Sequence, residues 1–229
     1  MEAWNTNNDP KVIGGYFVNS VKNKLGCPER IRADAGTENC YVKQMQSFLR
    51  DEHADRFAGV CSFMYGRSTA NQKIESFWSI LRREVTSFWM DLFKQLQIDN
   101  YFVGDLLDKN LIQFCFMDLV QADIDSTVSV WNSHRIRPSK MASLPCGRPA
   151  LMYSIPELYG VSDCLKAVTP ERIELCETEC LMKDNIPCDK DIFDLCQLLV
   201  NENMWDFPAD PHEMCDLYIQ LRNEIMNII

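Results

Sequence analysis

The sequence predicts an α/β domain at residues 1–149, followed by a mainly helical, acidic region at residues 150–229. In the first region, amphipathic stretches with helical spacing alternate with short apolar runs of strand length. The resulting order of helix, strand, helix, strand and helix is typical of an α/β layer with parallel strands. In the second region amphipathic helical stretches follow one another, so we expect several short helices there.

Local signals set the expected elements one by one. Asp9 and Pro10 predict the start of a first helix, because aspartate caps helix ends and proline is tolerated at the first helical position. Gly26 is expected to end this helix. Residues 31–34 are a short strand candidate, and the mostly apolar run at residues 57–65 is also short, as strands are. Further helices are expected at about residues 38–51, 71–96, 100–131, 189–203 and 211–228.

The formal net charge of −10 at pH 7 is unevenly distributed along the 229 residues. Residues 1–90 hold 12 basic and 10 acidic residues, whereas residues 149–229 hold 5 basic and 16 acidic ones. The first part is therefore close to neutral, and its basic clusters can still face a phosphate backbone. The acidity of the last part disfavours DNA contact and indicates a small helical domain or a protein-binding region.

Eleven cysteines without a signal peptide predict an intracellular protein, nuclear or cytoplasmic, with reduced thiols. No window approaches 18 consecutive apolar residues, so no membrane-spanning helix is expected. Cys176, Cys180, Cys188 and Cys196 are spaced unlike the close ligand pairs of zinc sites. The first two would lie one turn apart on a helix, where we expect them to pack as small apolar side chains.

Two carboxylates occupy positions that suit metal chemistry. Asp34 ends a predicted strand, and Glu75 lies in the first turns of a predicted long helix. Functional groups gather at the carboxyl ends of strands in an open α/β sheet, so both side chains could reach one site there. Mg²⁺ prefers a few carboxylates together with water and substrate phosphate. The alternative is that Asp34 caps a turn and Glu75 is a solvated helix residue.

Several motifs surround these two residues and recur in order along the chain. Residues 31–39, IRADAGTEN, place an aspartate after a short apolar strand, followed by a small residue, a glycine and a polar pair. Residues 68–78, STANQKIESFW, place an asparagine four positions before the glutamate and an aromatic pair after it, and LRRE follows at residues 81–84. WNSHRIRP at residues 131–138 and LPCGRP at residues 144–149 come later. Together these motifs resemble the integrase catalytic core of DDE-type transposases and retroviral-type integrases, in a transposon-derived form.

The resemblance implies an RNase H-like fold and Mg²⁺-dependent strand transfer on DNA, by in-line attack at phosphorus, with Mn²⁺ as the other suitable ion. It implies metal ligation and a catalytic role for Asp34 and Glu75. The family carries a first aspartate on its first strand, some fifty residues before the second, whereas only 33 residues precede Asp34 here. We therefore expect an incomplete, N-terminally truncated core with the first strand missing. Residues 2–4 would be the end of the second strand, and Asp9 fits better as a helix cap than as a replacement ligand.

The resemblance also implies DNA as a partner, and we expect nucleic-acid contacts from six residues: Asn71, Lys73, Arg82, Arg83, His134 and Arg135. The first four flank Glu75 on its helix or on the loop before it, where polar residues of the family meet DNA. The last two open a basic run at residues 131–148. The alternatives are a solvated helix face with internal ion pairs for the first group and a solvated connector for the second.

Three functions remain open from the sequence. The chain is part of an active integrase, a domesticated non-catalytic module that binds nucleic acid or protein, or an interaction or structural protein that retains only the remnant of the fold. We expect an integrase-core-like protein that is inactive alone because one of three catalytic carboxylates is absent. Homo-oligomerisation and protein binding by the acidic region are further expectations.

Overall fold

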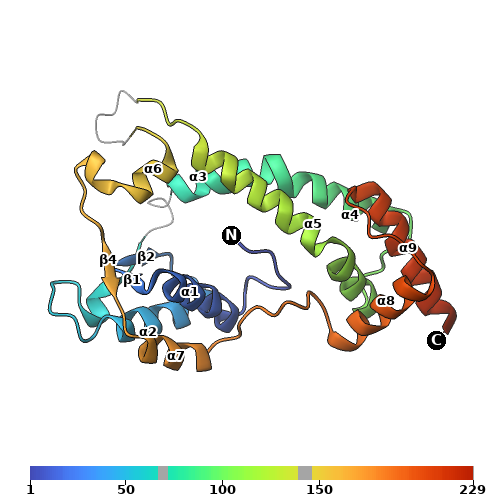
Figure 1. Cartoon of the computed structure of the whole chain (residues 1–229), viewed down its shortest axis with the longest axis horizontal. Coiled ribbons are helices and arrows are strands. Elements are labelled where there is room, and N and C mark those ends of the chain that lie inside the picture. The colour runs from blue at the N-terminus through green and yellow to red at the C-terminus, as the bar shows by residue number, and fades with distance from the viewer. Residues whose placement is uncertain (67–71, 139–145, 229) are drawn as a thin grey trace. The chain divides into compact units, whose positions relative to one another are not determined.

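The computed structural model describes residues 1–66, 72–138 and 146–228. The chain forms two compact units that interleave along the sequence, and Figure 1 shows the elements of each. Unit 1 consists of Met1–Asn5, Ser76–Asn132 and Asp184–Ile229, and unit 2 consists of Thr6–Glu75 and Ser133–Lys183. Both units contain residues from before and after residue 149, the predicted domain boundary. That boundary stays a prediction.

Three helices build the core of unit 2. Helix α1 spans Pro10–Lys24, and Asp9 caps it by accepting a hydrogen bond from the Lys11 amide, as predicted. Helix α2 spans Cys40–Leu49 after a 3₁₀ turn at Thr37–Asn39, and α7 spans Pro170–Thr178. The buried side chains of this core are Val18, Val21, Met45, Leu49, Ile173 and Cys176 from the three helices and Cys27 from the segment after α1. Residues beyond 149 therefore complete a core that begins at residue 10.

The predicted parallel strands of unit 2 are present but short. Strand β2, Ile31–Ala33, pairs in parallel with β3, Phe63–Tyr65. The strand expected at residues 57–65 is correct only at its end, because Gly59–Ser62 forms a 3₁₀ turn. The Ser62 hydroxyl closes that turn by donating to the Gly59 carbonyl at 2.7 Å. The small parallel sheet among many helices agrees with the predicted α/β class.

A second sheet in unit 2 was not predicted. Strand β1, Gly26–Pro28, follows the left-handed residue Leu25 at the end of α1 and pairs antiparallel with β4, Leu165–Ala167. Glycine and proline make β1 a weak strand pattern, and its partner lies far along the chain. A short helix, α6 at Pro149–Ser154, and a 3₁₀ turn at Pro156–Tyr159 precede β4.

Long helices build unit 1. Helix α4 spans Ser87–Ile98 and α5 spans Leu106–Ser133, while α8, Lys190–Glu202, and α9, Pro211–Ile228, confirm the two helices expected near the chain's end. Their buried side chains form one apolar cluster that includes Trp89, Leu111, Phe116, Cys196 and Tyr218. Within the described residues, no helix combines the length and apolar character needed to cross a membrane.

The helix that carries Glu75 contains a π-helical turn. Helix α3, Gln72–Leu81, continues through a π segment at Arg82–Thr86 into α4. The wider turn shifts the helical phase, and in α4 Trp89 is buried whereas the neighbouring Phe88 is exposed. The Trp89 indole donates to the Asp123 carboxylate at 2.9 Å. Ile74 and Trp78 of α3, although large and apolar, are each 50% exposed.

The N-terminal residues differ from the expected second strand. Residues 2–4 form no strand and belong to unit 1. The Ala3 amide donates to the Gln121 side-chain carbonyl at 2.8 Å, and the Gln121 amide group donates to the Met1 carbonyl at 2.9 Å. Hydrogen bonds with the Gln121 side chain of α5 thus satisfy backbone groups that a sheet would otherwise pair.

A buried carboxylate ties the start of α5 to α9 in unit 1. Asp108 is fully buried and accepts hydrogen bonds from the amides of Val103 and Gly104, at 2.6 and 3.3 Å. Arg222 Nε donates to Asp108 Oδ1 at 2.7 Å, and the Tyr218 hydroxyl donates to the Tyr101 carbonyl at 2.8 Å. Burial and the Asp108 charge raise the pKa of Tyr218, which therefore stays a neutral donor.

Asp108→Ala should lower the free energy of unfolding by about 3 kcal/mol, because it leaves the Arg222 cation without its partner in a nearly buried site. Urea denaturation followed by circular dichroism measures this loss. Asp194→Ala is the control, since Asp194 pairs with Lys190 on an exposed face of α8 and should contribute little. Equal losses in the two variants would contradict the role of the buried network.

Close packing in unit 2 depends on a glycine in the middle of α1. A Cβ atom at Gly15 would lie 2.3 Å from the carbonyl oxygen of Leu181, whose amide donates to the Lys11 carbonyl at 3.2 Å. Only a residue without a side chain therefore lets the segment after α7 lie against α1. This contact holds the segment around Leu181, which lies beyond the sequence motifs of residues 31–149, against α1.

Gly15→Ala should destabilise the protein by roughly 1–3 kcal/mol, because the clash with a backbone carbonyl outweighs the better helix propensity of alanine. Thermal and urea unfolding measure the change. Asn19→Ala, at an exposed position of the same helix, also gains helix propensity but meets no clash, so it should be neutral or slightly stabilising. A stabilised Gly15→Ala variant would show that the close approach has no energetic weight.

Candidate functional site

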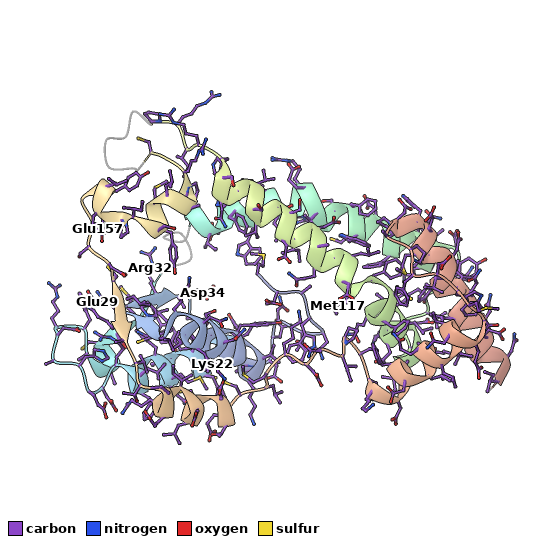
Figure 2. The ribbon with its side chains drawn as sticks, viewed as in Figure 1. Lys22, Glu29, Arg32, Asp34, Met117 and Glu157 are labelled. Atoms are coloured by element: carbon purple, nitrogen blue, oxygen red, sulfur yellow. The ribbon has the colours of Figure 1, made fainter. Side chains whose placement is uncertain are left out.

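Asp34 lies directly after β2 and is exposed at the end of the strand, as Figure 2 shows. The side-chain amide of Asn39 donates to Asp34 Oδ1 at 3.2 Å and to Glu38 Oε1 at 3.0 Å. A Cβ atom at Gly36 would lie 2.0 Å from Glu38 Oε1, so this glycine makes room for the carboxylate. The motif residues after the strand thus fold back and hold two acidic side chains beside one amide.

The pairing of β2 with β3 fixes which edge of the sheet these groups occupy. Ala33 lies opposite Tyr65, and the Gly66 amide donates to the Ala33 carbonyl at 2.8 Å. The chain therefore leaves β3 at the same edge at which Asp34 follows β2. Residues 67–71 lie outside the described residues, and α3 begins immediately after them at Gln72. Glu75 is exposed in the first turn of α3 and belongs to unit 2, as Asp34 does.

The donor chemistry of Asp34 and Glu75 suits a hard divalent cation. Both are exposed carboxylates, and Mg²⁺ binds through one or two carboxylates while it keeps several waters. Within residues 1–66, 72–138 and 146–228, no group of three or more His, Cys, Asp or Glu side chains is arranged to hold a metal ion. The donor chemistry of these two carboxylates suits an ion that takes its remaining ligands from water and phosphate.

The predicted nucleic-acid contacts are distributed over both units. Asn71 lies outside the described residues, and so does the side chain of Lys73. Arg82 and Arg83 lie on the π segment in unit 1, where both are exposed. Arg83 Nε pairs with the neighbouring Glu84 at 2.7 Å on an exposed surface, which agrees with the alternative of internal ion pairs on a solvated face.

His134 and Arg135 lie in unit 2, immediately after the end of α5 at Ser133. Arg135 is exposed and His134 is half-buried. Ile136 follows them and forms an antiparallel bridge with Gly147 through two backbone hydrogen bonds of 2.8 and 3.2 Å. The basic run therefore begins in a segment that is anchored at both ends, and its contact with DNA stays a prediction.

Sequence reasoning missed a set of cations that lie on aromatic rings in unit 2. Lys43 Nζ lies 4.9 Å from the ring centroid of Tyr65, next to the edge that Asp34 occupies. The guanidinium carbons of Arg30 and Arg56 each lie 4.7 Å from the ring centroid of Phe57. The adjacent basic and aromatic residues at 56 and 57 were the available signal, but the contribution of Arg30 depends on tertiary structure.

The four cysteines named in the sequence are divided between the two units. Cys176 and Cys180 lie in unit 2, whereas Cys188 and Cys196 lie in unit 1. Cys176 is buried in the apolar core of unit 2, as predicted, and burial raises its pKa to about 11. Burial likewise raises the pKa of Cys196 to about 12. Thiols of this kind are poor nucleophiles, because the thiolate is the reactive form.

Comparison with known proteins assigns the family. The integrase core domain family matches residues 1–146, which cover all the motifs up to the start of the LPCGRP segment. No curated protein and no solved structure matches the chain. Because the match spans more than half of the sequence, the chain belongs to the integrase core domain family, and the resemblance inferred from the motifs is confirmed.

Alkylation by iodoacetamide at neutral pH should separate the cysteines by burial. Cys61, Cys146 and Cys164 are exposed and should react first, whereas Cys115 and Cys196 should react only after unfolding. Mass spectrometry of the modified peptides measures the order. Rapid modification of Cys115 in the folded protein, where burial raises the thiol pKa far above its usual value, would show that the unit 1 core opens readily.

Proposed function

We propose that this chain is an integrase-core protein on an incomplete RNase H-like fold that binds DNA, with Asp34 and Glu75 as its metal ligands. The observation that carries the proposal is the parallel pairing of β2 and β3. It puts Asp34 and the start of the connection to the Glu75 helix at one sheet edge, where active sites of α/β sheets form. The family match over residues 1–146 supports DNA as the substrate class.

The proposed site uses oxygen ligands only. Asp34 and Glu75 would each supply a carboxylate to Mg²⁺ or Mn²⁺, and water and a DNA phosphate would supply the remaining ligands. Bound there, the metal would stabilise developing negative charge on the phosphate and activate a water or hydroxyl group. Asn39 would keep the Asp34 carboxylate oriented through its 3.2 Å hydrogen bond.

We further propose that the chain alone does not complete strand transfer. The family motif has three carboxylates, and the one aspartate that precedes Asp34 in this sequence is Asp9. The Asp9 side chain accepts a hydrogen bond from the Lys11 amide at 2.8 Å as the cap of α1, so it serves the helix and not a metal. With two carboxylates the site holds an ion weakly and lacks the second anchor for a metal pair.

The second candidate is a non-catalytic module that binds nucleic acid or protein. The exposed pair of Arg83 and Glu84 favours it, because an internally paired helix face needs no substrate. This module would keep DNA or protein binding but would show no metal dependence at Asp34 and Glu75. Metal binding by these two residues therefore separates the two candidates.

Iron(II) in place of Mg²⁺, with ascorbate and peroxide, should cut the backbone near residues 34 and 75, because hydroxyl radicals form where the metal is held. Gel electrophoresis with sequencing of the fragments locates the cuts. The double variant Asp34→Asn with Glu75→Gln should lose both cuts. Its matched control, Glu213→Gln with Asp216→Asn, makes the same changes on the exposed surface of α9 and should keep them.

Plasmid nicking provides the activity readout. The chain alone should bind a labelled duplex at low salt. With Mg²⁺ it should not nick the plasmid. Any nicking that does appear must vanish in the Asp34 and Glu75 double variant. Cuts elsewhere than these two residues, or nicking that persists in the double variant, would reject the proposed metal site.

A further inference from the structure

We propose that Arg30 and Arg56, held on the ring of Phe57, form a second contact for DNA phosphates at the edge of the β2–β3 sheet opposite to Asp34. The inference rests on the proposed function, because that function supplies DNA as the ligand. It adds a binding site that the sequence motifs do not contain and that lies outside the metal site.

The two arginines share one aromatic platform. Their guanidinium carbons each lie 4.7 Å from the Phe57 ring centroid, within the range of a cation–π contact. Phe57 is half-buried, and both arginines are exposed. A half-buried ring that fixes two exposed guanidinium groups reduces the side-chain freedom lost when an anion binds. The planar guanidinium also matches the paired oxygens of a phosphate.

Nearby carboxylates are already occupied by other cations. Both oxygens of Asp55 are engaged, with Arg50 at 2.5 Å and with the Phe57 amide at 2.9 Å. Glu29, next to Arg30, pairs with Lys166 at 2.8 Å. Arg172 takes the carboxylates that precede this loop, Asp51 and Glu52.

Within the part of the chain that the structure describes, Arg30 and Arg56 have no carboxylate partner. The acidic groups around them are instead neutralised by Arg50, Lys166 and Arg172. Two exposed positive charges therefore remain at this edge of unit 2, in a chain whose net charge is −10. An anion is the ligand that this arrangement favours.

The position of the pair favours a nucleic acid over a small anion. Arg30 directly precedes β2, and Asp34 directly follows it, so the two ends of one strand carry the two contacts. Figure 2 shows Glu29 and Asp34 at opposite ends of this strand. At about 3.3 Å per residue the strand separates Arg30 from Asp34 by roughly 13 Å. Duplex DNA, with one phosphate per roughly 3.4 Å of each strand, can reach both ends at once.

The salt dependence of DNA binding tests this assignment, with a short labelled duplex as the probe and fluorescence anisotropy as the readout. Each phosphate contact contributes roughly 0.9 to the slope of log affinity against log salt. Arg30→Ala with Arg56→Ala should therefore reduce the slope by about 1.8 and weaken binding. Phe57→Leu keeps both charges but removes the platform, so it should weaken binding with a smaller change in slope.

The matched control is Lys22→Ala with Lys190→Ala. It also removes two positive charges, but these lysines already pair with Glu177 and Asp194 on exposed surfaces. Its slope should therefore stay near that of the unchanged protein. Circular dichroism of each variant establishes folding, and Arg30→Gln with Arg56→Gln, which keeps longer polar side chains, must reproduce the reduced slope.

The outcomes separate this inference from the proposed function. DNA binding with an unchanged slope in both arginine double variants overturns the arginine contact and leaves the proposed function standing. Absence of DNA binding by the unchanged protein at low salt overturns both. Loss of slope in the arginine variants, with the slope retained when Asp34→Asn is combined with Glu75→Gln, supports a phosphate site that works independently of the metal ligands. Tighter binding of the arginine pair to an acidic peptide than to duplex DNA also overturns the assignment.

Discussion

The arrangement of the proposed site depends on the parallel pairing of two three-residue strands. Ile31 lies opposite Phe63 and Ala33 lies opposite Tyr65, and the Gly66 amide extends the ladder by one hydrogen bond to Ala33. Because side chains alternate along a strand, a shift by one residue would turn the strand's side chains to the other face. The direction of pairing decides which ends of the strands meet. It therefore determines that Asp34, and not Arg30, shares an edge with the connection to the Glu75 helix.

Such short strands need support from the helices around them, and part of that support comes from beyond the family match. The match ends at residue 146, but α7 contributes Ile173 and Cys176 to the core of unit 2, and β4 pairs with β1. Gly15 lets the segment after α7 approach α1 closely. The later residues thus act as structural partners of the site-bearing unit, in addition to supplying the helices of unit 1.

Local signals predicted much of this fold, and tertiary effects account for what they missed. The cap at Asp9, strand β2 and helices α8 and α9 follow from spacing and end signals, and they were predicted. Strand β1 could not be predicted, because Gly26–Pro28 has no strand pattern and its pairing depends on a distant segment. The π turn could not be predicted either, since the residues around it fit an ordinary helix equally well. For the site, motifs indicated Asp34 and Glu75, whereas the contact of Arg30 with Phe57 arises only from folding.

The distribution of ion pairs explains how a chain with a net charge of −10 keeps exposed cations beside the β2–β3 sheet. Charge counted along the sequence assigns the negative excess to residues 149–229, yet two basic residues of that region pair with carboxylates of the first part. Lys166 pairs with Glu29, and Arg172 pairs with Asp51 and Glu52. Each pairing removes negative charge from the neighbourhood of the β2–β3 sheet. Screening limits the reach of the remaining acidic groups to about 8 Å at physiological ionic strength, so the potential at the sheet depends on its nearest neighbours and not on the net charge.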